Sequence, residues 1–177
     1  FNQNIELSVE FQDRPEILIN KRNNQIHIIC REISHYYRAL NYAIHHMEED
    51  EFQYREHVCF ERNGLMLDCS RNAVFTVEKV KFLIKTLAKL GMNVLMLYTE
   101  DTYEVEGQPY FGAYRGKYTK DEIKELDAYA SMFGVELVPC IQTLAHLHNV
   151  LKWPGMDKIR DSADILQPEK EETYQFI

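Results

Sequence analysis

Three short apolar segments, each ending in a polar cluster, constrain the fold of this chain more than any other feature. Residues 94–98 read Val-Leu-Met-Leu-Tyr and lead directly to the carboxylates Glu100 and Asp101. The same pattern occurs twice more, with apolar and polar parts at residues 64–67 and 68–72, and at residues 135–141 and 142–146. A segment that is apolar on both faces is typical of a buried parallel strand, and α/β folds place their chemistry at the carboxyl ends of such strands. The pattern therefore predicts an α/β fold with its functional residues along one edge of a parallel sheet.

Two amphipathic segments separate the three predicted strands. Apolar residues three and four positions apart predict helices over residues 76–91 and 119–134. In the second helix, Thr119 and Glu122 have the spacing of a capping box. The alternation of strands and helices predicts the first three to four strands of a (β/α)8 TIM barrel, with residues 164–166 as the candidate for the fourth strand. Because a closed barrel takes about 250 residues, we expect residues 61–177 to be the truncated N-terminal portion of a catalytic barrel.

Residues 1–60 predict a small α+β domain ahead of the barrel. Short strand candidates with a hairpin turn at Asn23 and Asn24 predict an antiparallel meander, and they lie at residues 5–11, 16–20 and 25–30. Apolar residues at helical spacing between Ile33 and Met47 predict one helix that covers this sheet. Residues 52–60 alternate loosely and are a candidate for a further strand.

Charge and sequence motifs disfavour several classes of function. The chain of 177 residues has 28 acidic and 20 basic side chains, and its formal net charge of -8 opposes binding to nucleic acid or to an anionic membrane. No apolar stretch approaches the roughly 18 residues that a membrane span needs. The chain also lacks a glycine-rich phosphate loop, a Gly-x-Ser-x-Gly elbow and a His-Glu-x-x-His helix, which disfavours nucleotide and serine hydrolases. We expect no cofactor.

The spacing of the four cysteines argues against a disulfide framework. None of them forms a Cys-x-x-Cys pair, and each lies in or beside an apolar segment: Cys30, Cys59, Cys69 and Cys140. Such cysteines behave as small buried hydrophobes. We therefore expect reduced core thiols and a cytoplasmic location, with a disulfide or a metal site as the alternative.

The polar clusters after the first two strands supply candidate site residues. Glu100 and Asp101 are adjacent on a strand end, so their side chains diverge and do not form an acid/base pair across one substrate bond. They either bind substrate hydroxyls or form structural hydrogen bonds. Asp68 and Arg71 follow the first strand, where they either contact a ligand or brace neighbouring strands.

Two loops add further candidates. Residues 102–118 are longer than a minimal strand-to-helix loop and contain Arg115 and five aromatic residues, Tyr103, Tyr110, Phe111, Tyr114 and Tyr118. Aromatic faces in such loops suit sugar rings, although they also pack against one another. After the third strand, His146 and His148 form a His-x-His pair, which metal hydrolases also use. A metal site would need further ligands at other strand ends, so a metal-dependent hydrolase is a minor alternative.

The ordered combination of these segments resembles glycoside hydrolase family 20, and it is most similar to the bacterial N-acetyl-β-D-glucosaminidase branch. The resemblance covers residues 60–177 and is carried by residues 64–74, 91–101, 110–112, 115–119 and 135–147. It implies an exo-acting β-N-acetylhexosaminidase that removes terminal β-linked N-acetylglucosamine or N-acetylgalactosamine. In this family the 2-acetamido group of the substrate is the nucleophile, so the implied reaction is retaining and passes through an oxazolinium intermediate.

The resemblance also implies where the reaction takes place. The family's catalytic Asp-Glu pair follows the fourth barrel strand and is expected beyond residue 177, so the pair Glu100 and Asp101 is not that pair. We therefore expect no catalytic residue and no activity in this fragment. His146 matches the family's active-site histidine after the third strand. Many members carry a sugar-binding arginine five residues before Asp68, but Asn63 occupies that position here, with Arg62 beside it.

The departure at Asn63 leaves the sugar contact open among several residues. Arg62, Arg71 or the Asp101 carboxylate could take over the contact, and the complete set of predicted substrate-binding residues is Asp68, Arg71, Glu100, Asp101, His146 and Arg62. The expected partner is a terminal N-acetylhexosamine of a glycan or oligosaccharide. We also expect the missing C-terminal half of the barrel, or another chain, to cover the open sheet edge. A non-catalytic carbohydrate-binding barrel is the second alternative.

Overall fold

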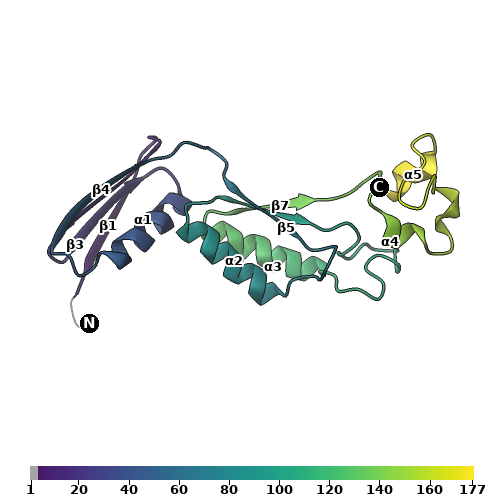
Figure 1. Ribbon diagram of the computed structural model, residues 1–177, viewed down its shortest axis with the longest axis horizontal. Coiled ribbons are helices and arrows are strands. Elements are labelled where there is room, and N and C mark those ends of the chain that lie inside the picture. Colours follow the sequence, from purple (N-terminus) through teal and green to yellow (C-terminus); the bar gives the residue numbers. More distant parts are fainter. Residues whose placement is uncertain (1–3) are drawn as a thin grey trace. The chain divides into compact units, whose positions relative to one another are not determined.

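The computed structural model describes residues 4–177 and contains two β-sheets with associated helices (Figure 1). The first three residues of the predicted domain 1–60 lie outside the described part. The chain divides into two compact units. One comprises the chain up to Leu65 with Glu78–Leu95 and Ala128–Leu137, and the other comprises Met66–Val77, Met96–Asp127 and Val138–Ile177. The domain boundary between residues 60 and 61 stays a prediction.

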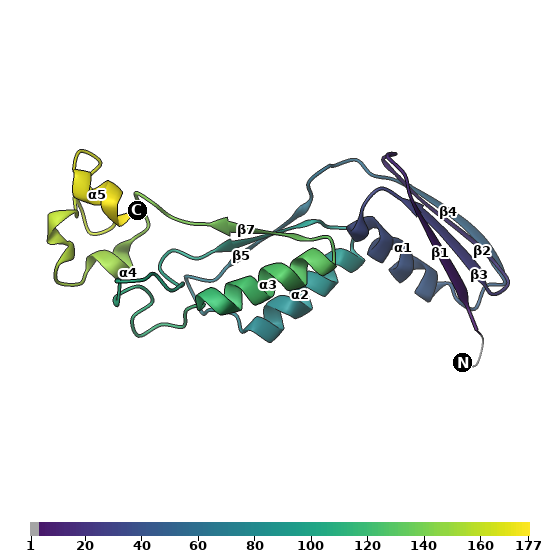
Figure 2. The same cartoon turned by 180° about the vertical axis from the view of Figure 1, so that it is seen from behind.

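The first sheet contains the four strands predicted before residue 61. They are β1 (Glu6–Phe11), β2 (Glu16–Arg22), β3 (Gln25–Cys30) and β4 (Glu51–His57). Asn23 has a φ of 51° and forms the turn between β2 and β3 together with Asn24, which confirms the predicted hairpin. The predicted helix is α1 (Ile33–His45), and both views show it along one face of the sheet (Figures 1 and 2).

The predicted antiparallel meander is wrong for the first strand. The strand order is β1-β3-β2-β4, and β1 runs parallel to β3 instead of pairing with β2. Residues 12–15 cross the end of β3, where the Gln12 N–H donates to the Cys30 carbonyl at 2.9 Å. Because neighbouring strands lie about 4.8 Å apart, this short loop is long enough to pass over one strand and begin β2 on its far side.

Buried and more exposed side chains alternate along β2 and β3, and the buried ones form the core of this sheet. One face of these strands and one side of α1 carry the buried side chains: Ile17, Ile19, Ile26, Ile28, Cys30, Ala39 and Ala43. Full burial of each isoleucine contributes about 1.5–3 kcal/mol. The two helix residues in this set are fully buried alanines, which allow the helix backbone to approach the sheet closely.

The second sheet confirms the three strands predicted from the apolar segments. Its strands and connecting helices are β5 (Gly64–Asp68), α2 (Val77–Lys89), β6 (Val94–Tyr98), α3 (Lys120–Met132) and β7 (Glu136–Cys140). The strand order is β5-β6-β7. The Asn93 N–H donates to the Asn63 carbonyl before the strands, and the Cys69 N–H donates to the Tyr98 carbonyl after them, so β5 and β6 are parallel.

The fourth barrel strand predicted at residues 164–166 does not form. Within residues 4–177, Leu166 makes only an isolated bridge with Arg160, and the second sheet is open. This part of the chain instead contains α4 (His148–Leu151), a 3-10 turn η1 (Met156–Lys158) and α5 (Glu171–Phe176). Leu147, Val150, Leu151 and Leu166 are buried in one cluster with Phe111. These apolar residues therefore pack between loops and short helices.

The predicted ends of α3 have the expected geometry. The Thr119 N–H donates to the Glu122 carboxylate at 2.8 Å and the Glu122 N–H donates to the Thr119 hydroxyl at 3.2 Å, which is a reciprocal capping box. Gly134 follows the helix with a φ of 66°. A Cβ at this position would lie 2.7 Å from the backbone nitrogen of Ser34. Glycine is therefore required both by the backbone conformation and by the close approach to α1.

The cysteines are all free thiols, but they do not all lie in the core. Cys30 and Cys69 are buried and Cys140 is partly buried, whereas Cys59 is exposed because it lies in the irregular segment after β4. Burial raises the pKa of the Cys30 thiol to about 11, so this side chain behaves as a neutral apolar group. Among the described residues, no helix has the length and apolarity needed to cross a membrane.

His35 predicts a loss of stability in mild acid. His35 lies in the first turn of α1, its side chain is buried, and its Nδ1 has no hydrogen-bond partner among the described residues. Desolvation lowers the pKa of His35, against the opposing effect of Glu32, so the unfolded chain takes up the proton more readily than the folded one. The free energy of unfolding should therefore fall as the pH drops below about 6.5, the usual pKa of histidine.

Urea denaturation at pH 7.5 and 5.5 measures this effect. His35→Gln should reduce the difference in unfolding free energy between the two pH values, while the same substitution at the exposed His45 should leave it unchanged. Equal pH dependence in the wild type and in both variants would contradict the prediction.

Candidate functional site

Asp68, the last residue of β5, organises the turn that follows the strand. Its Oδ1 accepts hydrogen bonds from the N–H and the hydroxyl of Ser70, both at 2.9 Å, and from the N–H of Arg71 at 3.2 Å. Its Oδ2 accepts a hydrogen bond of 2.7 Å from the Arg71 guanidinium. Partial burial alone would raise the pKa of the Asp68 carboxyl, but these hydrogen bonds hold it well below its usual range. Asp68 is therefore a charged anchor that fixes the position of Arg71.

Arg71 joins the end of β5 to the end of β6. Its guanidinium lies 4.8 Å from the centre of the Tyr98 ring and donates to the Tyr98 hydroxyl at 3.3 Å. The same hydroxyl donates to the Glu100 carboxylate at 3.3 Å, and Arg71 Nη2 is 4.0 Å from that carboxylate. The Arg71 side chain remains 56% exposed. We call Asp68, Arg71, Tyr98 and Glu100 the strand-end cluster; it brings together three of the predicted site residues.

Glu100 is held in place by the third strand as well. Its N–H donates to the side-chain carbonyl of Gln142, just after β7, at 2.7 Å. Glu100 has a φ of 49°, an uncommon backbone conformation for a residue other than glycine. Tyr98 and Gln142 were not predicted as site residues. The period-two alternation of a strand was the available signal for Tyr98, since it places residues 98 and 100 on one face.

Asp101 points to the opposite face and lies in a buried ion pair. Its side chain is 2% exposed and accepts a hydrogen bond of 2.5 Å from Arg115. The Gly112 N–H donates to its second oxygen at 3.2 Å, and Arg115 also donates to the Ser70 carbonyl. The sugar contact predicted for Asp101 therefore lacks an accessible carboxylate. Arg115 thus connects the loops that follow β5 and β6, a bracing role that was not predicted from the sequence.

Arg62 lies at the other end of β5 from Asp68. It pairs with Glu136, the first residue of β7, on the solvent-exposed surface. Beside it, the Asn63 N–H donates to the Asn93 side chain at 2.9 Å. Both residues precede β5, whereas the strand-end cluster follows it. Arg62 therefore lies away from the strand-end cluster, and Arg71 is the arginine at the carboxyl ends of the strands.

His146 is exposed on the segment after β7. Its φ is 60°, and its ring makes no hydrogen bond to any other residue between 4 and 177. His148 begins α4, where its N–H donates to the Asp164 carboxylate at 3.1 Å. No group of three His, Cys, Asp or Glu side chains suited to a metal ion occurs in the described part of the chain. The metal-dependent alternative therefore has no ligand set within these residues.

A crevice extends from the strand-end cluster along the neighbouring loops. It has a volume of about 680 Å³ and is lined by Arg71, Glu100 and the residues Cys69, Ser70, Asn72, Ala73, Val74, Tyr114, Arg115, Gly116 and Asn149. Ligand pockets typically have volumes of about 300–1,000 Å³. Its lining combines one aromatic ring with amide, guanidinium and carboxylate groups, which suits a neutral polyhydroxylated ligand.

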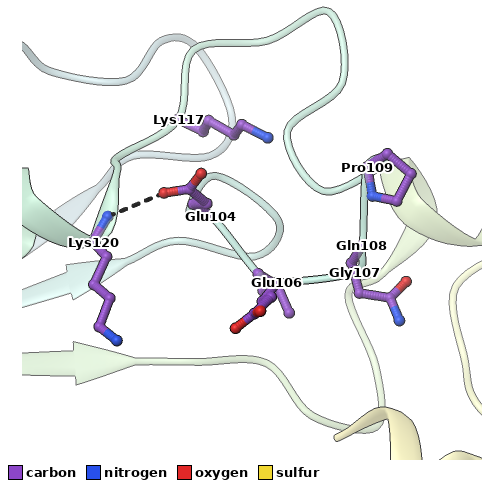
Figure 3. A pocket seen from close by; sticks show the side chains of 8 residues that line it. Glu104, Glu106, Gly107, Gln108, Pro109, Lys117 and Lys120 are labelled. Atoms are coloured by element: carbon purple, nitrogen blue, oxygen red, sulfur yellow. Dashed lines mark hydrogen bonds between the residues drawn. The ribbon is translucent and has the colours of Figure 1, made fainter.

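A second pocket lies within the loop after β6 (Figure 3). Its volume is about 800 Å³, and Figure 3 shows Glu104 between Lys117 and Lys120 on one side. The Lys120 N–H donates to the Glu104 carboxylate at 3.4 Å. None of the predicted site residues lines this pocket. The strand-end cluster and the crevice therefore remain the best candidate for ligand binding.

Comparison with known proteins identifies the family. Residues 60–177 match the family described as glycosyl hydrolase family 20, catalytic domain. The chain belongs to glycosyl hydrolase family 20. Hexosaminidase D from Bos taurus is 31% identical over 91 residues, which are 50% of this chain and 26% of that protein. A beta-hexosaminidase from Vibrio furnissii is 30% identical over 118 residues, covering 52% of this chain and 19% of that protein.

Solved structures of family 20 enzymes share the fold of the whole described chain. The β-N-acetylhexosaminidase from Streptomyces coelicolor A3(2) superposes with a TM-score of 0.79 at 19% identity, over 98% of this chain and 43% of that one. The chitobiase from Flavobacterium johnsoniae gives a TM-score of 0.77 at 21% identity, over 99% and 31% of the two chains. The family 20 chain thus spans less than half the length of these relatives.

The buried ion pair of Asp101 and Arg115 should contribute far more to stability than the exposed ion pair of Arg62 and Glu136. Arg115→Ala or Asp101→Ala leaves a buried charge without its partner, so either should lower the free energy of unfolding by about 3–5 kcal/mol. The double variant should lose clearly less than the sum of the two single losses, because the charges are coupled.

Urea denaturation of the three variants forms a double-mutant cycle, with Arg62→Ala as the matched control. Removal of the exposed Arg62 charge should change the unfolding free energy by at most about 1 kcal/mol. Additive losses in the cycle, or a loss for Arg62→Ala as large as that for Arg115→Ala, would contradict the assignment.

Proposed function

We propose that the full-length protein is an exo-acting β-N-acetylhexosaminidase that removes terminal β-linked N-acetylglucosamine or N-acetylgalactosamine. The observation that carries the proposal is the half-exposed Arg71, held between the carboxylates of Asp68 and Glu100 at the carboxyl ends of a family 20 sheet. The proposal is also supported by the names of the relatives. Solved family 20 structures include a Streptomyces plicatus beta-hexosaminidase in complex with the product GlcNAc, and a Vibrio harveyi enzyme in complex with N-acetylglucosamine.

The strand-end cluster suits the hydroxyl groups of a terminal sugar. A sugar hydroxyl both donates and accepts hydrogen bonds, so a guanidinium and a carboxylate side by side can hold two neighbouring hydroxyls. Each hydrogen bond to a charged group is worth about 1.5–3 kcal/mol. Arg71 therefore supplies the donors and Glu100 the acceptor, while Asp68 keeps Arg71 in position. His146 matches the active-site histidine of the family, and we propose that it helps to shape the sugar pocket of the complete barrel.

The reaction itself is proposed to use the substrate's 2-acetamido group as the nucleophile, with retention of configuration through an oxazolinium intermediate. The polarising Asp and the general acid Glu belong to the barrel beyond residue 177. General acid–base catalysis is worth about 10²- to 10⁴-fold, so residues 1–177 alone should bind sugar without cleaving it efficiently.

The remaining barrel strands, or another chain, would cover the open edge of the sheet. The free thiols support a cytoplasmic location for this protein.

A pair of substrates tests the proposal on the full-length protein. The enzyme should hydrolyse 4-nitrophenyl N-acetyl-β-D-glucosaminide and should not measurably hydrolyse 4-nitrophenyl β-D-glucoside, because the glucoside lacks the acetamido nucleophile. Equal turnover of both substrates, or no turnover of the first, would overturn the proposal. Binding of N-acetylglucosamine without any turnover would indicate a non-catalytic carbohydrate-binding barrel, and loss of activity with a chelator would indicate a metal-dependent hydrolase.

A further inference from the structure

The side chain of Gln142 connects the segment after β7 to the turn after β6. Its Oε1 accepts a hydrogen bond of 2.7 Å from the Glu100 N–H, although the two residues are 42 positions apart in the sequence. Its Nε2 lies 3.8 Å from the Cys140 sulfur, which is only a weak acceptor. The amide oxygen therefore makes the stronger contact, and this contact is to the backbone of a residue that lines the crevice.

Glu100 needs an acceptor from outside its own turn. The Thr102 N–H donates to the Thr99 carbonyl at 2.9 Å, so Glu100 and Asp101 are the two central residues of a β-turn. Glu100 has a φ of 49°, and glycine is the usual residue where the first central position of a turn has a positive φ. A glutamate in this conformation is strained and persists only when neighbouring groups hold it there. The hydrogen bond to Gln142 is such a restraint.

The carboxylate of Glu100 is held less tightly than its backbone. The Tyr98 hydroxyl donates to it at 3.3 Å, and Arg71 Nη2 lies 4.0 Å from it. Both distances are longer than those of strong hydrogen bonds, which for O–H···O contacts measure about 2.5–3.0 Å. The side chain is 13% exposed and lines the crevice, so it can accept a shorter hydrogen bond from a ligand. Its position therefore depends mainly on the conformation of the turn.

Gln142 itself is not among the residues that line the crevice. Its side chain is partly buried and directed at the backbone of Glu100. An effect of Gln142 on a ligand would therefore be transmitted through Glu100. If Gln142 only stabilised the fold, its loss would lower the melting temperature and leave the kinetics of the folded protein unchanged.

We propose that Gln142 is a positioning residue for the terminal sugar. By accepting the Glu100 N–H, it keeps the turn in its left-handed conformation and thereby fixes the carboxylate that accepts a hydrogen bond from a sugar hydroxyl. The inference rests on the proposed function, because it takes the strand-end cluster as the site of the terminal sugar. It adds a residue from the segment after β7 to a cluster that otherwise comes from the ends of β5 and β6.

Replacement of Gln142 in the full-length protein tests the inference. Gln142→Met keeps the length of the side chain but removes the acceptor, so kcat/KM for 4-nitrophenyl N-acetyl-β-D-glucosaminide should fall about tenfold, the equivalent of one net hydrogen bond. Gln142→Glu keeps an oxygen at the same position and should restore kcat/KM to within about threefold of the wild type. Gln53→Met, which changes an exposed glutamine of β4, should leave kcat/KM within about twofold.

A double-mutant cycle separates a role through Glu100 from a direct contact with the substrate. Glu100→Ala should also lower kcat/KM. Addition of Gln142→Met to this variant should cause less than about a further twofold loss, because the carboxylate that Gln142 positions is already absent. Multiplied losses in the double variant would overturn the inference. Unchanged kinetics in Gln142→Met would also overturn it, even if the melting temperature falls.

The inference and the proposed function can fail separately. Gln142→Asn, whose shorter side chain withdraws the amide from Glu100, should show the same loss and replaces Gln142→Met if that variant does not fold. Absence of turnover in the wild type would overturn the proposed function, and calorimetric titration with N-acetylglucosamine would then test Gln142 alone. Gln142→Met should bind this sugar about tenfold more weakly than the wild type. Equal affinities, or no binding by the wild type, would overturn the inference.

Discussion

The ion pair between Asp101 and Arg115 is the interaction on which the arrangement of the site depends. Asp101 follows β6 and is almost completely buried, and Arg115 reaches it from the end of the long loop after that strand. Burying a carboxylate is favourable only when its oxygens are hydrogen-bonded. Here one oxygen is bonded by Arg115 and the other by the Gly112 N–H, while Arg115 also holds the Ser70 carbonyl. The pair thereby fixes the loops after both β5 and β6.

Two adjacent carboxylates consequently have separate roles. Alternation along β6 places Leu95, Leu97 and Asp101 on the buried face, and Tyr98 and Glu100 on the face that remains accessible. Glu100 then meets Arg71 and the Tyr98 hydroxyl, while Asp101 meets Arg115. The same alternation that stabilises the sheet thus supplies one accessible carboxylate and one internal brace. An exchange of the two roles would require a one-residue shift in strand register.

The features predicted correctly from the sequence depend on local interactions. The hairpin at Asn23, the capping box of Thr119 and Glu122, and the order of strands and helices are each set by neighbouring residues, and the structure confirms them. The features that were predicted wrongly or not at all depend on contacts between residues that are distant in the sequence. The parallel pairing of β1 with β3 leaves no local signal, because a short loop can lead to either neighbour. The partner of Asp101 is fourteen positions away in a loop without regular spacing.

The arginine contact shows the same limit. Arg62 and Arg71 lie on either side of β5, and sequence order alone placed Arg71 at the carboxyl end of the strand. The structure adds their partners, which are Glu136 for Arg62 and the carboxylates of Asp68 and Glu100 for Arg71. Glu136 and Glu100 belong to the other two strand segments of the sheet, so no local signal in the sequence predicted these pairs.

The central claim is that Arg71 holds the terminal sugar, and a matched pair of variants tests it most directly. The measurement is kcat/KM of the full-length protein on 4-nitrophenyl N-acetyl-β-D-glucosaminide for Arg71→Ala and Arg62→Ala. Loss of hydrogen bonds from a charged group should lower the value for Arg71→Ala about 10- to 100-fold, and Arg62→Ala should remain within twofold of the wild type. Unchanged kinetics in Arg71→Ala, or an equal loss in Arg62→Ala, would contradict the account.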